Sequence, residues 1–161
     1  MTSMATAEVT TGSSTAPRQF VVFYLGEREY AVDILAVREI RGWTEVTAIP
    51  NAPPAVLGVV NLRGTIVPIL DLRVCFAQEA TTPNRSHVVI ILQIGEQLMG
   101  LLVDGVSDIL TVRASDIQPT PSLQGAGLAV VPELVTIDKR IVGVLALERF
   151  AATLTVLELP S

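Results

Sequence analysis

The chain has 161 residues, of which half are hydrophobic and 17% are charged, and its formal net charge is −5 at pH 7. This length suits one ordinary domain or two very small domains that share a core. The negative charge argues against nucleic acid as a partner, because phosphate backbones are bound by clustered Lys and Arg. No apolar run reaches the roughly 18 residues that a membrane-spanning helix needs, and the first residues lack a basic and an apolar signal region. We therefore expect neither secretion nor membrane insertion.

The chain order begins with a polar tail and a strand pair. Residues 1–17 are rich in Thr, Ser and Ala and predict a disordered tail. Two apolar runs joined at Gly26 then predict a β-hairpin. In the next segment, DILAVREI, Asp33 is a plausible N-cap, and Ile34, Val37 and Ile40 recur every three residues. This spacing predicts one helical turn with a single apolar stripe.

A second hairpin is predicted around the segment NLRGTIVPILDLR, which covers residues 61–73. Arg63 and Gly64 form its turn, because glycine accepts a positive φ and arginine is soluble enough for a loop tip. Gly64 is therefore expected to be a structural turn residue, whereas Arg63 is either merely solvated or a contact residue. Pro68 has no N–H, so the strand that follows is expected at a sheet edge or beside a bulge.

The chain also contains an internal repeat. At an offset of 69 residues the segment VVFYLGE aligns with IILQIGE, and at an offset of 75 GTIVPILDL aligns with KRIVGVLAL. Two copies of a unit with about five short strands suggest two small barrels rather than a solenoid. We assign the first barrel to roughly residues 19–80 and the second to roughly 86–150, with 81–86 as the connection.

Reactive side chains are few. His87 is the single histidine and stands beside Ser86 at a predicted strand start. Neighbouring strand residues point to opposite faces, so the two do not form a nucleophile and base pair, and we expect a solvated histidine. One histidine and Cys75, expected as a buried thiol, are too few for a structural zinc site. Asp104 is expected to accept backbone N–H groups at a turn. We expect no metal, no cofactor and no enzymatic activity.

Three blocks in order resemble the CheW-like chemotaxis coupling proteins: YAVDILAVREIRG (30–42), NLRGTIVPILDLR (61–73) and GLLVDGVSDIL (100–110). The resemblance implies an all-β fold of two side-by-side, five-stranded SH3-like barrels with short helical turns, in a domain placed at residues 18–155. It also implies a non-enzymatic adaptor between chemoreceptor signalling tips and the regulatory domain of the histidine kinase CheA. Such an adaptor is cytoplasmic and is recruited to membrane-associated receptor arrays.

The resemblance further implies two sets of binding residues. The receptor-binding set is Val37 and Val88 as an apolar floor, Glu39 and Arg63 as a charged rim, and Gly58. The kinase-binding set is Val21, Ile34 and Ile40, with Gln118 and Leu123 at a second contact where well-known members carry a basic and an aromatic residue. Apolar residues at this spacing are also typical of a core. Two alternatives stay open: a coupling protein of a related non-flagellar pathway, or a small ligand-binding or hydrolytic double barrel.

Overall fold

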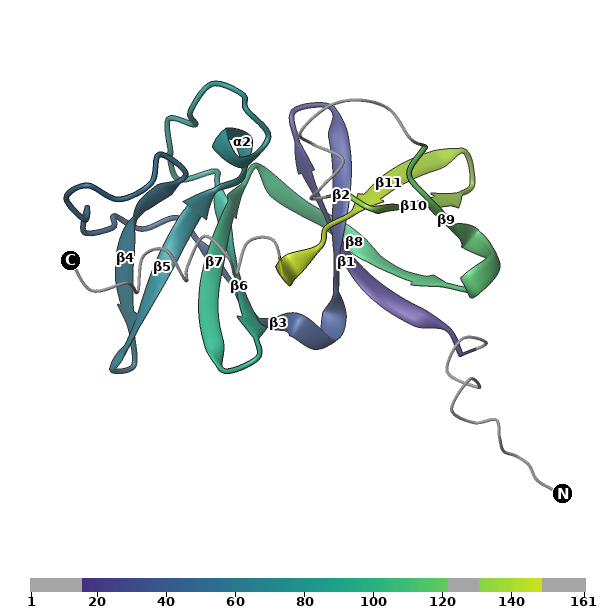
Figure 1. Cartoon of the computed structure of the whole chain (residues 1–161), viewed down its shortest axis with the longest axis horizontal. Helices are drawn as coiled ribbons and strands as arrows, with labels where there is room; N and C mark the ends of the chain where they lie inside the picture. The colour runs from purple at the N-terminus through teal and green to yellow at the C-terminus, as the bar shows by residue number, and fades with distance from the viewer. Residues whose placement is uncertain (1–15, 122–130, 149–161) are drawn as a thin grey trace, which may run out of the picture.

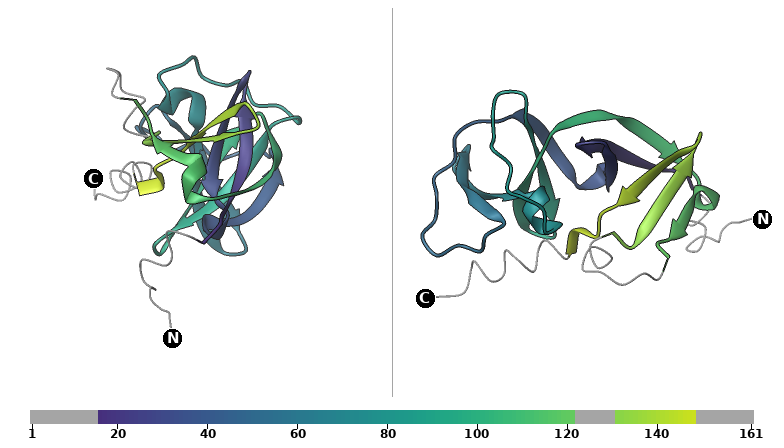
Figure 2. Two further views of the ribbon diagram at one scale, coloured as in Figure 1. Left: turned by 90° about the vertical axis from the view of Figure 1, so that its right-hand side faces the viewer. Right: turned by 90° about the horizontal axis from the view of Figure 1, so that it is seen from above.

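The computed structural model describes residues 16–121 and 131–148, and it is built almost entirely from β-strands (Figure 1). The strands form two lobes that lie side by side (Figures 1 and 2). Most of the predicted tail and the end of the predicted domain lie outside the described residues. In chain order the elements are β1 (Arg18–Leu25), β2 (Arg28–Asp33), the 3-10 turn η2 (Ile34–Ala36), β3 (Val37–Gly42), β4 (Val56–Leu62), β5 (Thr65–Asp71), α2 (Leu72–Cys75), β6 (Val88–Ile94), β7 (Gln97–Val103), β8 (Gly105–Val112), the 3-10 turn η3 (Ala114–Asp116), β9 (Ile117–Pro119), β10 (Glu133–Ile137) and β11 (Arg140–Val144).

Each sheet contains strands from both halves of the chain. One has the order β8-β1-β2-β11-β10-β9 and the other has the order β3-β6-β7-β5-β4. The predicted all-β fold with two side-by-side β units is confirmed, although one sheet has six strands rather than the predicted five. The assignment of one barrel to residues 19–80 and the other to 86–150 is wrong, because hairpin β1–β2 pairs with strands of the second half and hairpin β6–β7 pairs with strands of the first. A repeat in the sequence reports which segments are alike, not which of them pair.

The hydrogen-bonded ladders repeat with the same offset as the sequence. Ile40 of β3 lies opposite Ile90 of β6, and Ile109 of β8 lies opposite Val21 of β1. Ile109 is 69 residues after Ile40, and Val21 is 69 residues before Ile90. Both ladders also shift register by one residue, at Arg38 in β3 and at its counterpart in β8. The internal duplication predicted from the sequence is therefore present in the pairing of the strands.

The largest hydrophobic cluster contains residues of both sheets. Phe23 and Val32 of hairpin β1–β2 belong to the same cluster as Ile90 and Leu101 of hairpin β6–β7, and all four are fully buried. Each sheet has a smaller cluster of its own on its other face. Because burial of apolar surface is the main stabilising contribution to folding, the two lobes stabilise each other through this shared core.

The connection from β2 to β3 is less helical than the sequence pattern predicts. The Asp33 side chain accepts the N–H of Leu35 at 2.9 Å, so the predicted N-cap is confirmed. The 3-10 turn ends at Ala36, however, and Val37 already begins β3. The prediction that Ile34, Val37 and Ile40 lie on one helical turn is therefore wrong.

A β-bulge explains why the spacing of three still marks one face. Arg38 is the extra residue, so Val37 lies opposite Leu92 and Ile40 lies opposite Ile90. Residues directly opposite each other on neighbouring strands share a face of the sheet, and an inserted residue moves its successors to the other face. Val37 and Ile40 therefore both lie on the face that carries the shared core.

The β4–β5 hairpin has the predicted turn. Arg63 and Gly64 both have positive φ, 52° and 92°, as in the two-residue turns that suit the twist of antiparallel strands. Pro68 is not at a sheet edge, because β5 lies between β4 and β7. The alternative expectation of a nearby bulge is confirmed, because the β4–β5 ladder shifts register between Val56 and Gly58, next to the pair of Val59 and Pro68. The ladder with β7 begins at Ile69, one residue after the proline, so the missing N–H removes no bond from that ladder.

Candidate docking surface

The chain passes from one lobe to the other through η2 and β3 (Figure 1), and this crossing carries exposed apolar side chains. Leu35 is 89% exposed and Ile40 is 46% exposed. Their neighbours Ile34 and Val37 are half-buried and pack against the shared core. Large apolar side chains gathered on a surface are typical of a contact with another protein. We call these four residues the crossover strip.

Charged side chains form a second feature, the charged clasp of Glu39, Arg41 and Arg63. Glu39 and Arg41 lie opposite Ile91 and Val89, on the other face of β3 from the crossover strip. Oε1 of Glu39 accepts from Nη2 of Arg63 at 2.5 Å, and Oε2 accepts from Nη1 of Arg41 at 3.2 Å. The hydrogen bond from Arg63 holds the pKa of Glu39 below its ordinary value. Strands β3 and β4 stand at opposite ends of the sheet order, so the contact between Glu39 and Arg63 helps to close the lobe.

The other lobe contains a related but more enclosed clasp. Arg140 donates to both carboxylate oxygens of Glu29 and to both of Asp108, at 2.9 to 3.1 Å. Asp108 is the repeat counterpart of Glu39. The Arg140 guanidinium is thus engaged by two carboxylates within the chain. The Arg63 guanidinium, among the described residues, pairs with the single carboxylate of Glu39, and its side chain is 74% exposed. Arg63 is therefore the clasp arginine that is available to a partner.

The predicted receptor-binding residues do not all lie together. Glu39 and Arg63 are in contact, as their shared role on a rim requires. Val37 and Val88 lie on the same face of their sheet, but Val88 is four residues along β6 from Leu92, which faces Val37. Four strand residues span about 13 Å. The predicted apolar floor is therefore an extended surface rather than one compact patch.

Gly58 has a structural explanation. It is buried, its φ is 156°, and a Cβ atom there would overlap the carbonyl oxygen of Thr47 and lie 2.9 Å from Cγ2 of Val46. Thr47 and Val59 pair as an isolated bridge beside it. Glycine is required at this position because another segment of backbone approaches closely, so any influence of Gly58 on a partner acts through the placement of β4.

The predicted kinase-binding residues are also divided. Ile34 and Ile40 belong to the crossover strip. The prediction that Val21 contacts the kinase is wrong, because Val21 is 2% exposed and belongs to the shared core. Gln118 is exposed on β9, in the other sheet, and its side-chain amide donates to Oγ1 of Thr136 at 3.3 Å. Leu123 lies outside the described residues.

Leu35 is the exposed residue that sequence reasoning missed. The search for apolar residues at a spacing of three selected Ile34, Val37 and Ile40 and passed over the residue between them. The available signal was the N-cap. In a one-turn helix capped by Asp33, Leu35 is the second residue, and its side chain lies off the apolar stripe. Packing against the core then does not explain why Leu35 is apolar, which points to a contact with a partner.

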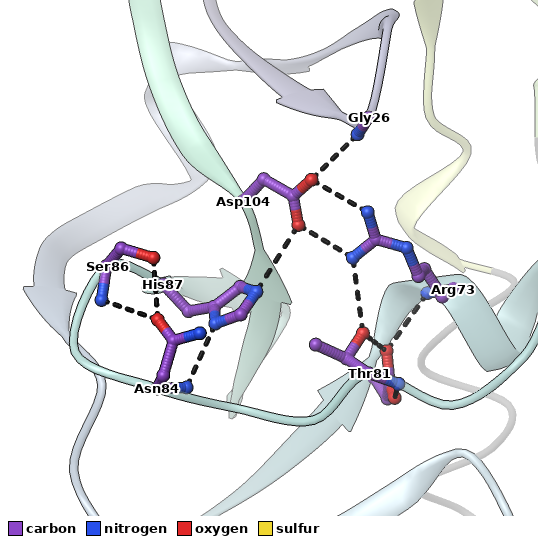
Figure 3. A network of polar contacts seen from close by, with 8 residues as sticks. Gly26, Arg73, Thr81, Asn84, Ser86, His87 and Asp104 are labelled. Atoms are coloured by element: carbon purple, nitrogen blue, oxygen red, sulfur yellow. Dashed lines mark hydrogen bonds and ion pairs between the residues drawn. The ribbon is translucent and has the colours of Figure 1, made fainter.

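The crossing from β7 to β8 carries a polar network instead of apolar residues (Figure 3). Asp104 accepts the N–H of Gly26 at 2.7 Å, which confirms the predicted backbone contact. It also forms a bidentate ion pair with Arg73 of α2, at 2.6 and 2.7 Å, and this hydrogen bonding lowers the pKa of Asp104. The ion pair was missed because sequence spacing does not reveal which distant residues meet.

The expectation that His87 is solvated is wrong. Its side chain is only 12% exposed, and Nε2 lies 3.5 Å from Oδ1 of Asp104. The fully buried carboxylate of Asp71 belongs to the same region and accepts both the N–H and the hydroxyl of Thr81, at 2.7 and 2.8 Å. The connection between the halves of the chain is thus held by polar contacts at both of its ends.

Other reactive features are limited within the described residues. Residues 16–121 and 131–148 contain no group of three or more His, Cys, Asp or Glu that could hold a metal ion. Burial raises the pKa of Cys75 to about 11, so the thiol is protonated and a poor nucleophile at neutral pH. No helix in these residues is long and apolar enough to cross a membrane.

Two joined β-lobes with an exposed apolar strip beside a charged clasp define a protein-binding module. Residues 19–154 match the family model described as CheW-like domain. The chain is 51% identical over 66% of its length to chemotaxis protein CheW of Rhizobium meliloti, covering 68% of that protein. It is 48% identical over 75% of its length to chemotaxis protein CheW of Klebsiella aerogenes, covering 72% of that protein. The chain belongs to the CheW-like domain family.

A solved structure supports the same assignment. The crystal structure of the scaffolding protein TtCheW from Thermoanaerobacter tengcongensis is similar with a TM-score of 0.75 and 31% sequence identity, over 81% of this chain and 89% of that chain. Members of this family are non-enzymatic scaffolding adaptors. The hydrolytic alternative is therefore discarded.

Proposed function

We propose that this chain couples chemoreceptor signalling tips to a CheA-type histidine kinase in bacterial chemotaxis. The observation that carries the proposal is that one strand, β3, of a CheW-like domain carries the crossover strip on one face and Glu39 of the charged clasp on the other. Such a strand offers apolar area for affinity and charges for register. The names of the relatives, chemotaxis protein CheW and scaffolding protein, support the same role.

The receptor side of the surface centres on Arg63. Its guanidinium is mostly exposed and has donor groups beyond the one that Glu39 uses. An acidic group on a helical receptor tip would pair with these donors, while Val37 and Val88 contact apolar residues of the helix. Glu39 orients Arg63, and Gly58 supports the surface only through the backbone.

The kinase side of the surface uses the apolar residues Ile34, Leu35 and Ile40. Leu35 replaces Val21 in this proposal, because an exposed leucine can be covered by a partner and a core valine cannot. Exposed apolar side chains of this size contribute about 1.5 to 3 kcal/mol each when fully covered. Gln118 and Leu123 stay proposed members of a second kinase contact on the other lobe.

The adaptor is proposed to act in the cytoplasm, at membrane-associated receptor arrays. A receptor and kinase pathway other than flagellar chemotaxis is the second candidate. A relative whose name does not mention chemotaxis, protein FrzA of Myxococcus xanthus, is 28% identical, and this chain matches 65% of it. Recovery of the receptor and kinase from the source cell with the full chain as bait distinguishes the two pathways.

The proposed function is tested by reconstitution of kinase signalling. CheA autophosphorylation is measured with a receptor signalling fragment, with and without the full chain. Addition of the chain is expected to change the rate only when receptor and kinase are both present. Ile40→Thr is expected to reduce this effect, and Ile109→Thr, at the equivalent and similarly exposed position of the other lobe, is the matched control. An unchanged rate on addition of the chain would refute the proposal, and equal losses in both variants would refute the assigned surface.

A further inference from the structure

The His87 imidazole lies between segments that are far apart in the chain (Figure 3). Nε2 faces Asp104 of the β7–β8 crossing at 3.5 Å, and Nδ1 accepts the N–H of Asn84 at 3.0 Å. The imidazole also borders a hollow of about 290 Å³ that Arg73 and Glu79 help to line. The ring therefore joins the connection between the two halves of the chain to the crossing between the two lobes.

The contacts fix which ring nitrogen carries the proton in neutral His87. Nδ1 accepts a hydrogen bond, so it has no proton, and the proton is on Nε2, directed toward Asp104. The turn around Asn84 also has three hydrogen bonds that do not involve the ring. The carbonyl of Asn84 accepts the N–H of His87 at 3.0 Å, and its side-chain Oδ1 accepts the N–H and the hydroxyl of Ser86 at 2.8 and 2.6 Å.

We propose that His87 is a proton-sensitive joint that releases the Asn84 amide when its imidazole becomes charged. Both ring nitrogens are donors in a protonated histidine. The new proton on Nδ1 would face the N–H of Asn84, and two donors cannot share a hydrogen bond. The Nε2 side keeps its partner, because the positive ring is attracted to the Asp104 carboxylate. Protonation of His87 thus breaks the hydrogen bond from Asn84 and keeps the contact with Asp104.

Charged groups of both signs surround the ring. Asp104 is a negative neighbour, and Glu79, also negative, lines the same hollow. Arg73 is a positive neighbour, and its guanidinium is bound to the Asp104 carboxylate at 2.6 and 2.7 Å. Asp71 is farther along the network and is bound by Thr81. Histidine is the side chain that ordinarily changes charge between about pH 5 and 8, so a test of the joint spans that interval.

The turn is continuous with the strand that carries the docking surface. The carbonyl of His87 accepts the N–H of Trp43 at 3.1 Å, and Val88 pairs with Gly42 at the end of β3. Release of the Asn84 amide therefore takes place next to the Gly42 end of the β3–β6 ladder. The joint is a property of the isolated chain and does not depend on which partner binds it.

The test is nuclear magnetic resonance of the full chain between about pH 5 and 8. The Asn84 amide resonance is expected to shift with the same midpoint as the His87 ring, and the amide is expected to lose its protection from hydrogen exchange below that midpoint. A ring that titrates while the Asn84 and Ser86 amides stay unchanged would overturn the proposal. A ring that does not titrate in this interval would overturn it as well.

Two variants identify the titrating group. His87→Gln is expected to abolish the pH-dependent shift of the Asn84 amide, whereas Glu79→Gln is expected to preserve it. Loss of the shift in Glu79→Gln would show that the carboxylate is the source and would contradict the proposal. Should His87→Gln not fold, the comparison of ring and amide midpoints in the unaltered chain decides the question.

Discussion

The turn residues Arg63 and Gly64 show how backbone conformation limits the substitutions that can test a contact. Both have positive φ, a region that β-branched residues rarely adopt and that asparagine and glycine tolerate. Replacement of Arg63 by alanine would therefore mix loss of charge with backbone strain. Arg63→Asn removes the guanidinium at a position where asparagine is suited to the turn, so it isolates the contact.

Gly64→Val is expected to destabilise the fold by about 1 to 3 kcal/mol, because valine is strained at a φ of 92°. No atom lies within 4 Å of a Cβ built at this position, so the cost is conformational rather than a clash. Gly64→Asn is the matched control and should be clearly less destabilising. Urea unfolding measures both, and equal destabilisation by the two variants would contradict the account.

Asp104 gives a prediction about pH. Its ion pair with Arg73 lowers its pKa from the ordinary 3.8, so the folded chain favours the charged carboxylate. The resulting stabilisation is present above pH 3.8 and is lost as the pH falls through the lowered pKa. Asp104→Asn should therefore be less stable than the unaltered chain at pH 7, and the difference should narrow in strong acid. A difference that stays constant down to pH 3 would argue against this ion pair.

At the level of elements, β3 combines core and surface on one face. Its bulge at Arg38 keeps Val37 and Ile40 aligned with the buried β6 residues Leu92 and Ile90. The sequence could predict the hairpins, because glycine turns between apolar runs have few other interpretations. It could not distinguish a helical turn from a bulged strand, because both give apolar residues at a spacing of three.

The β3–β6 pair gives a prediction that separates surface from core. Ile40→Thr retains a β-branched side chain at an exposed position and should change the free energy of unfolding by about 0.5 kcal/mol or less. Ile90→Ala, directly opposite, removes buried methyl groups and should cost about 2 to 5 kcal/mol. Denaturant unfolding compares the two. A large loss in Ile40→Thr would place this side chain in the core rather than on a docking surface.

At the level of the whole molecule, the two halves of the chain exchange their first hairpins. Hairpin β1–β2 completes the sheet of the second half, and β6–β7 completes that of the first. The repeat was visible in the sequence because equivalent positions in the two copies need the same kinds of residue. The exchange was not visible, because a duplicated unit can pair within itself or across copies with the same apolar pattern.

The exchange predicts that neither half folds alone. Fragments 1–82 and 83–161 each lack a hairpin that their sheet requires, and each loses half of the shared core. Each fragment should be largely unfolded by circular dichroism, and an equimolar mixture should recover the β-sheet spectrum of the full chain. A fragment that gives a cooperative unfolding transition by itself would show that one half contains a complete barrel.

The candidate site was predictable only where the family resemblance brought its residues together. Glu39 and Arg63 could be paired through the family resemblance, and the structure brings them into contact. Contacts that depend on the exchanged topology, such as Arg73 with Asp104, could not be predicted from spacing. Exposure also could not be predicted within an apolar run, so buried Val21 was chosen and exposed Leu35 was missed.

The central claim is that one chain presents separate receptor and kinase surfaces, and a pair of titrations with Arg63→Asn tests it most directly. The variant is titrated against a receptor signalling fragment and against the isolated regulatory domain of the kinase. Receptor binding should weaken by about tenfold or more, since hydrogen bonds to charged groups contribute about 1.5 to 3 kcal/mol, and kinase binding should be unchanged. Equal losses toward both partners, or a loss toward neither, would contradict the assignment of the receptor surface to the charged clasp.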